Sequence, residues 1–218
     1  MMAMTQRIEP ELHPVKVADL RPTQMTVGLR EVVVKQAEWR RTATTKGPEF
    51  LGKHMIPAVL GPKQRLWLID HHHLARALHD EGVEHVLVTI VARLQHLDKN
   101  RFMAFLDCRN WLHPYDEKGQ RCSWQDIPKH VSALVDDPYR SLAGAVRQNG
   151  GYAKTATPYS EFLWADFFRH KISAKQIDRK FGLAVEQATE LARSHAAAYL
   201  PGFAGKEAGH QHESDDSD

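Results

Sequence analysis

The chain has 218 residues, of which 42% are hydrophobic, and its formal net charge is +2. This composition supports a packed core and excludes a disordered chain, and the balanced charge gives no general preference for nucleic acid or membrane surfaces. No apolar run approaches the roughly 20 residues of a membrane span. We therefore expect a cytoplasmic protein with no membrane partner.

The first half of the chain alternates between strand and helix patterns. A short strand is expected at 15–17, and Pro22 fixes a turn after it because proline restricts φ and lacks a donor. The apolar spacing after Gly28 predicts a helix. The segments 54–60 and 66–69 are separated by Gly-Pro-Lys-Gln and predict a hairpin.

The pattern then continues with a helix over 74–81, which we expect to end at Gly82. The β-branched run 86–91 predicts a buried strand, and Asp98 is expected to cap a further helix. These elements predict a small mixed-sheet domain over residues 12–111.

The rest of the ordered chain is predicted to be helical. We expect this helical half to span 112–203 and to pack on the first domain, which gives an α/β (α+β) fold class. The tails 1–11 and 204–218 are expected to be disordered. The helices are expected at 130–135, 137–146, 159–168, 175–181 and 184–199.

The two cysteines, Cys108 and Cys122, fit neither a zinc-binding nor a CxxC redox pattern. We expect them to be buried thiols in a reducing compartment.

The most informative motif is the run Asp70-His71-His72-His73, where strand 66–69 turns into the following helix. Asp70 is a good N-cap residue and would place the three imidazoles in the first helical turn. The free N–H groups and the positive helix end favour an anion there, and imidazole can move a proton. The motif therefore predicts a site for phosphate, for proton transfer or for a metal.

Helical spacing allows His72, Arg76 and His79 to share one face. In the functional interpretation Arg76 pairs with phosphate oxygens, while His72 or His73 acts as an acid, a base or a charge stabiliser. In the structural alternative this face is merely solvated. His72 and His73 point about 100° apart, so a transition metal would need ligands from elsewhere, and no metal site is predicted.

Several segments resemble the ParB-like nuclease branch of the ParB/sulfiredoxin superfamily. The resemblance rests first on the strand–turn–helix that carries Asp-His-His-His-Leu-Ala-Arg-Ala. It covers residues 12–203, nearly the whole chain expected to be ordered. The other similar segments are 20–24, 27–28, 136–143, 150–152 and 161–169.

The resemblance implies a nucleotide site, because superfamily members hold the phosphates of CTP, ATP or ADP at this turn. We expect Mg²⁺ to accompany the nucleotide. Where sulfiredoxins have a nucleophilic cysteine this chain has histidine, which argues against sulfinic-acid reduction. The implied phosphate-binding residues are Thr23, Gln24, Asp70, His71 and Arg76, and the implied catalytic residues are His72, His73 and Glu31, the last as a general base.

Three functions remain open at this point. The first is a nucleotide-binding phosphotransferase or NTPase, the second a metal-dependent DNA-binding nuclease, and the third a non-catalytic protein that senses a ligand or binds a partner. DNA has weak support, because the segment 172–183 is only faintly similar to a helix-turn-helix and the helix after it is acidic. The expected partner is a nucleotide or small molecule, and the sequence leaves a homodimer open.

Overall fold

The computed structural model describes residues 12–205. They form parts of two compact units, which divide between Ser141 and Leu142. The domain division expected after residue 111 stays a prediction, and the predicted tails lie almost entirely outside the described residues. No helix in this range is long and apolar enough to cross a bilayer.

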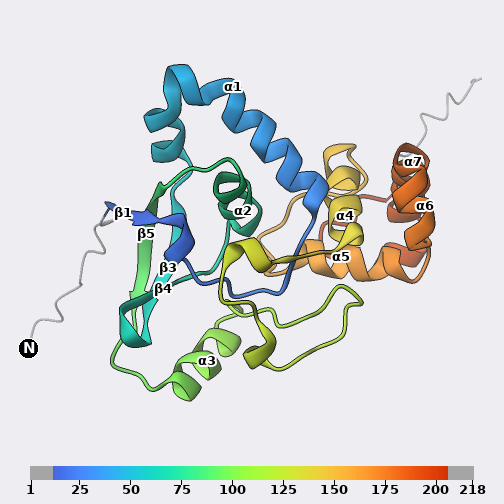
Figure 1. Cartoon of the computed structure of the whole chain (residues 1–218). Coiled ribbons are helices and arrows are strands. Elements are labelled where there is room, and N and C mark those ends of the chain that lie inside the picture. Colours follow the sequence, from blue (N-terminus) through green and yellow to red (C-terminus); the bar gives the residue numbers. More distant parts are fainter. Residues whose placement is uncertain (1–11, 206–218) are drawn as a thin grey trace, which may run out of the picture. The chain divides into compact units, whose positions relative to one another are not determined.

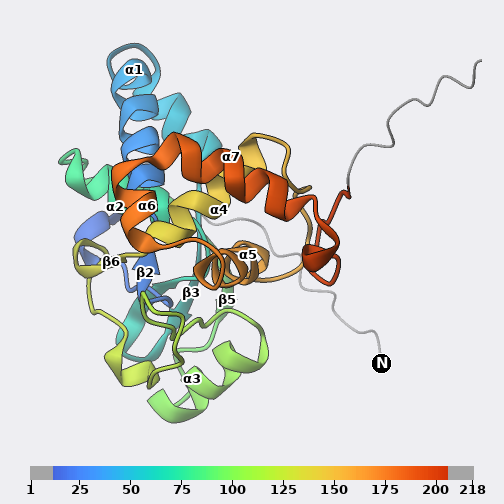
Figure 2. The ribbon, with the colours of Figure 1, turned by 90° about the vertical axis from the view of Figure 1, so that its right-hand side faces the viewer.

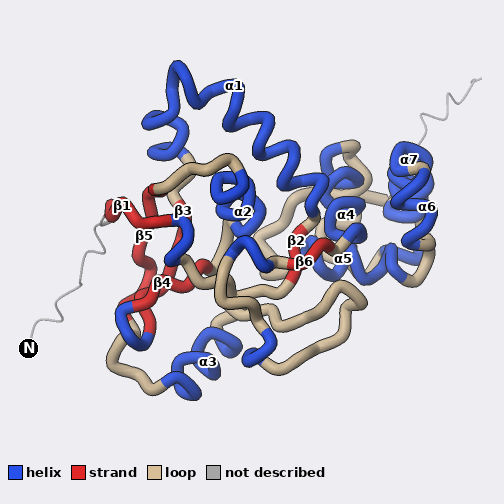
Figure 3. The backbone as a smooth tube through the Cα atoms, in the orientation of Figure 1, coloured by secondary structure: helices blue, strands red, loops and turns tan. Residues whose placement is uncertain are grey.

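A four-stranded mixed sheet forms the centre of the first unit, with the strand order β1-β5-β3-β4 (Figures 1 and 3). The predicted hairpin is confirmed, because β3 and β4 pair in antiparallel fashion. Strand β5 returns parallel to β3, and β1 pairs antiparallel with β5. The strands are β1 (Leu12–Lys16), β3 (Ile56–Gly61), β4 (Arg65–Leu68) and β5 (His85–Arg93).

The sheet carries a separate hydrophobic core on each face. Helices α1 (Leu29–Lys53) and α2 (His72–Asp80) pack on one face, where Ala58 and Val88 are fully buried. Helix α3 (Lys99–Cys108) packs on the other face against Val59. Alternating side chains of a strand point to opposite faces, and a bulge between Ala58 and Val59 adjusts the register locally.

One predicted helix is wrong. Residues 130–135 form a single 3-10 turn, Val131–Ala133, followed by the short strand β6 (Val135–Asp136). Strand β6 pairs in parallel with β2 (Thr26–Val27), more than a hundred residues earlier. Val131 and Leu134 are buried in the core beneath α2, so tertiary packing and this distant pairing override the local helical pattern.

Helix α4 (Pro138–Gln148) begins at the end of the first unit and continues into the second. The second unit is helical, as expected (Figure 2). Its core centres on the fully buried Trp164, which stacks on Tyr152 with the ring centroids 4.2 Å apart and donates from Nε1 to the Pro201 carbonyl. The further helices are α5 (Ser160–Arg169), α6 (Ala174–Arg179) and α7 (Phe181–Ala192).

The helix expected to run to residue 199 ends instead at Ala192. Ser194 has an extended backbone, and its hydroxyl donates to the Leu191 carbonyl, which ends the helical hydrogen-bond series. The α/β (α+β) fold class is confirmed by the mixed sheet and the helical second unit. The cysteines are free, but Cys108 is exposed and Cys122 only half-buried, so the expected burial is wrong.

Candidate functional site

The strand-to-helix turn after β4 differs from the prediction by one residue. Helix α2 begins at His72, and its N-cap is His71, not Asp70. His71 has φ 61° and ψ 28°, a left-handed conformation that reverses the chain before the helix starts. The Asp70 carboxylate accepts from the His71 amide at 2.6 Å, so Asp70 supports the turn rather than the first helical amides.

The first three amides of α2 belong to His72, His73 and Leu74. Donors at this position have no acceptor within their own helix. The N-cap side chain makes no hydrogen bond to them, and no other described group accepts from them. Because peptide dipoles place partial positive charge at this end, the turn presents donors suited to an anion.

His72 is buried and fastens the preceding loop to α2. Its Nε2 accepts a hydrogen bond from the Thr23 amide at 3.1 Å. The Thr23 hydroxyl donates to the Leu68 carbonyl at 2.5 Å, which ties the same loop to the end of β4. Burial, followed by the charge of Arg140, lowers the pKa of His72 to about 3. The imidazole is therefore neutral, with its Nε2 lone pair directed at Thr23.

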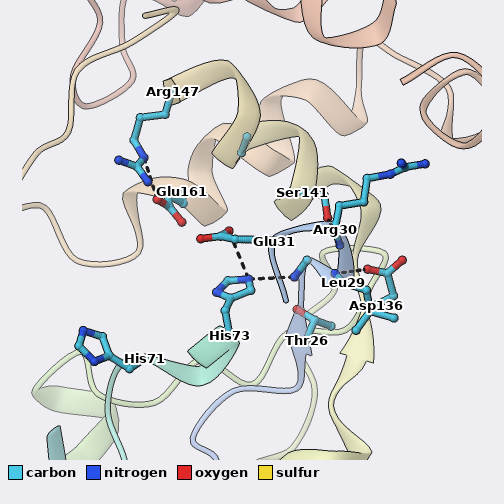
Figure 4. Close-up of polar contacts among 12 residues, drawn as sticks. Thr26, Leu29, Arg30, Glu31, His71, His73, Asp136, Ser141, Arg147 and Glu161 are labelled. Carbon is cyan, nitrogen blue, oxygen red and sulfur yellow. Dashed lines mark hydrogen bonds and ion pairs between the residues drawn. The ribbon is translucent and has the colours of Figure 1, made fainter. Parts of the chain in front are cut away.

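His73, the next residue of the helix, also binds a backbone amide of the preceding loop. Its Nε2 accepts from the Gly28 amide at 2.9 Å, and it lies 3.5 Å from Oε2 of Glu31 (Figure 4). Burial and then Arg140 hold the pKa of His73 well below its usual range. Because the two imidazoles point in different directions, they hold two separate points of the 23–28 loop against α2.

The start of α1 is held by residues that precede or begin α4. The Leu29 amide donates to Oδ1 of Asp136 at 2.8 Å, and the Arg30 amide donates to Oγ of Ser141 at 3.2 Å (Figure 4). A Cβ at Gly28 would lie 2.7 Å from the Ser141 amide nitrogen and hydroxyl, so this close approach requires glycine. The α1 amides are consequently used internally, unlike those of α2.

A buried guanidinium contributes to the electrostatics of this region. Arg140 is only 5% exposed, and its charge lowers the pKa values of His72, His73 and His113 after the larger effect of burial. The pKa of His113 falls to about 3. Positive charge and neutral imidazoles therefore lie together behind the start of α2.

One buried hydroxyl near this contact lacks a hydrogen bond. Thr26 is 1% exposed and stands two residues before Gly28. Its Oγ1 has no partner among the described residues. Buried polar atoms are normally satisfied, so this hydroxyl is an exception within the loop.

The remaining predicted residues have other partners. Arg76 donates to Oδ2 of Asp80 at 2.8 Å and to the Leu134 carbonyl at 2.9 Å, and His79 also contacts Asp80. Gln24 is buried and donates to the Thr26 carbonyl at 2.7 Å. The exposed His71 imidazole points away from His73 (Figure 4). The binding and catalytic roles of all these residues stay predictions.

Sequence reasoning missed two members of this region, His113 and Gly28 as a hydrogen-bonding partner. It singled out Arg140 and Ser141 as candidate ligand or capping residues without placing them near the histidines. Gly28 and Arg140 stood in recognised segments, but nothing local showed that they meet the histidines. Among the described residues there is no group of three or more His, Cys, Asp and Glu side chains that could hold a metal.

Comparison with known proteins adds three findings. A family model described as "Putative ParB-like nuclease" matches residues 13–170. The crystal structure of protein Atu1540 from Agrobacterium tumefaciens is similar, with a TM-score of 0.86 and 50% sequence identity over 91% of this chain and 99% of that chain. No functionally curated protein matches the sequence.

Proposed function

The chain belongs to the ParB-like nuclease family, and we propose that it binds the phosphate of a nucleotide at the start of α2. The reaction proposed there is phosphoryl transfer or nucleotide hydrolysis with Mg²⁺. Phosphoryl transfer depends mainly on positioning and on stabilisation of negative charge, both of which a rigid, positively polarised turn can provide.

The observation that carries this proposal is the unused amides of His72, His73 and Leu74. They stand at the positive end of a nine-residue helix with no side-chain cap. The buried Arg140 adds positive charge near His72 and His73. A phosphate group matches this combination of donors and charge.

In this proposal His72, which is buried, and His73, which is part-buried, are positioning residues. Their Nε2 lone pairs hold the 23–28 loop, and their lowered pKa values keep them neutral at physiological pH. Glu31 is then the candidate general base, since its carboxylate lies beside the loop contact. Mg²⁺ would be held by phosphate oxygens and one carboxylate, Asp70 or Glu31, which is its common manner of binding.

A thermal-shift measurement with one designed variant tests the proposal. ATP, ADP, CTP and inorganic phosphate are added to the wild type, each with and without Mg²⁺. A ligand present at 100 times its Kd adds about 2.7 kcal/mol, which raises Tm by a few degrees. His71→Asp places a carboxylate beside the α2 amides without disturbing a buried group and should abolish this shift.

His85→Asp is the matched control, because it makes the same change at an exposed position on β5. It should keep the nucleotide shift of the wild type. The proposal fails if no nucleotide or phosphate raises Tm, or if the His71→Asp protein responds as the wild type does.

Metal-dependent cleavage of nucleic acid is the alternative that the description of the family favours. It would require a metal held largely by the substrate, because the described residues contain no cluster of three or more metal-binding side chains. Plasmid incision that requires a divalent cation and is lost in His71→Asp would place nuclease activity at the same turn.

A further inference from the structure

A group of five cationic side chains gathers in the first unit away from the start of α2. It comprises Arg21, Lys63, Arg65, Lys99 and Lys129, called here the basic surface. The last four are exposed and Arg21 is half-buried. They come from four places in the chain, residues 21, 63–65, 99 and 129, so their proximity is a product of the fold.

The segment around Arg21 joins three of these places. Arg21 lies alongside β4, where its amide donates to the Leu66 carbonyl at 2.9 Å and its carbonyl accepts from the Leu68 amide at 2.8 Å. Its side chain donates from Nη1 to the Lys129 carbonyl at 2.6 Å. Arg21 therefore stands between the loop that carries Lys129 and the strand that begins with Arg65.

Helix α3 brings the remaining cation to the same region. Phe102 of α3 packs against Trp67, and a Cβ at Gly61 would lie 2.6 Å from the Phe102 ring. This tight contact fixes α3 against the 3-10 turn Pro62–Gln64, which contains Lys63. Lys99, the first residue of α3, lies over the Trp124 ring with Nζ 4.6 Å from its centroid.

The charges of the basic surface influence one another. Burial and then the charges of Lys129, Arg65, Lys63 and Arg21 lower the pKa of Lys99. Among the described residues, no carboxylate forms an ion pair with Lys63, Arg65, Lys99 or Lys129. The whole chain is nearly neutral at +2, and Asp19 acts on Arg21 alone among these cations. The basic surface is therefore a local concentration of positive charge that favours a polyanion.

We propose that the basic surface binds the phosphate backbone of a single-stranded nucleic acid. The cations are spread over a turn, a strand, a helix and a loop, which suits an extended polyanion better than one phosphate group. The half-buried Trp67 and Trp124 rings lie among them, and aromatic rings beside a basic track are typical of single-strand binding. This surface shares no residue with the α2 site, so it does not depend on that proposal.

The test measures the salt dependence of binding to a fluorescein-labelled single-stranded DNA longer than about 16 nucleotides by fluorescence anisotropy. The variant Lys63→Gln/Arg65→Gln/Lys99→Gln removes three exposed charges. At low salt it should bind at least about tenfold more weakly than the wild type, and its slope of log K against log salt should be smaller by about 2.

The matched control, Lys171→Gln/Lys175→Gln/Lys180→Gln, removes three exposed cations around α6. It should bind the oligonucleotide as the wild type does. The proposal is overturned if the wild type shows no salt-dependent binding, if the first variant keeps wild-type affinity, or if the control loses as much. It is also overturned if the wild type binds anionic phosphatidylserine vesicles through these cations but not the oligonucleotide. Circular dichroism and Tm confirm that each variant is folded.

Discussion

Each of the two histidines at the start of α2, the buried His72 and the part-buried His73, uses one ring nitrogen to hold a loop amide. His72 accepts from Thr23, and His73 accepts from Gly28. A lone pair used in this way is not available to take a proton from a substrate without breaking the contact. Loss of activity in a His72 variant would therefore reflect displacement of the Thr23 loop as well as loss of any direct role of the imidazole in the reaction.

His72→Ala should lower the free energy of unfolding by about 3 kcal/mol. The substitution leaves a cavity at a position that is 4% exposed and removes the acceptor of the buried Thr23 amide. Urea denaturation measures the difference. His79→Ala is the control on the same helix. Its effect should stay within about 0.5 kcal/mol, because His79 is half-buried and Asp80 is its ring's one hydrogen-bonding partner among the described residues. Equal stability of the His72→Ala protein and the wild type would contradict this role.

At the scale of the element, α2 ends as its sequence predicts. Gly82 has φ +72°, its amide donates to the His79 carbonyl, and the Val83 amide donates to the Leu78 carbonyl. This pair of bonds is the Schellman motif, and it satisfies carbonyls that the end of the helix would otherwise leave free. Leu78 belongs to the core and the partly buried Val83 packs against that core, so the motif also brings a hydrophobic contact.

Gly82→Ala should therefore destabilise the protein by about 1 kcal/mol, because alanine is strained at positive φ. Gly82→Asn should cost less, since asparagine tolerates the left-handed conformation better. No heavy atom lies within 4 Å of a Cβ at this position, so steric contact does not complicate the comparison. Thermal or urea denaturation of both variants measures the order, and a more stable Gly82→Ala protein would refute the explanation.

Elements with strong local signals were predictable, and those held by distant partners were not. Asp98 caps α3 as expected, with Oδ1 accepting from the Arg101 amide at 3.0 Å. Strand β6 was mistaken for part of a helix because its only strand partner, β2, lies more than a hundred residues away. A two-residue strand has no periodicity of its own from which it could be recognised.

At the scale of the whole molecule, the histidines couple stability to pH. His72, His73 and His113 have pKa values below the usual 6.5 in the folded protein, mainly because burial disfavours the charged ring. Below pH 6.5 the unfolded chain binds protons at these positions while the folded chain does not. Folding stability is therefore complete above pH 6.5 and falls as the pH decreases towards the folded pKa values, which are about 3 for His72 and His113.

The free energy of unfolding should fall between pH 7 and pH 5. Each histidine contributes a slope that approaches about 1.4 kcal/mol per pH unit once the pH is well below 6.5. Urea denaturation at a series of pH values measures the slope. Measurements are kept above pH 5, because Asp and Glu side chains titrate mainly below that pH and would add their own slope. A flat profile in the wild type would mean that these histidines take up protons in the folded protein as readily as in the unfolded chain, which contradicts the lowered pKa values.

The sequence by itself determined the fold class, the family resemblance and the place of the strand-to-helix turn. These depend on local features: apolar periodicity, capping residues, a glycine at a helix end and a motif that is continuous in the chain. The tertiary structure alone decided that His72 and His73 hold the loop of Thr23 and Gly28. It alone also brought Arg140 near the histidines and gathered the basic surface. The physical reason is that these contacts join residues far apart in sequence, and local propensity carries no information about which distant side chains will meet.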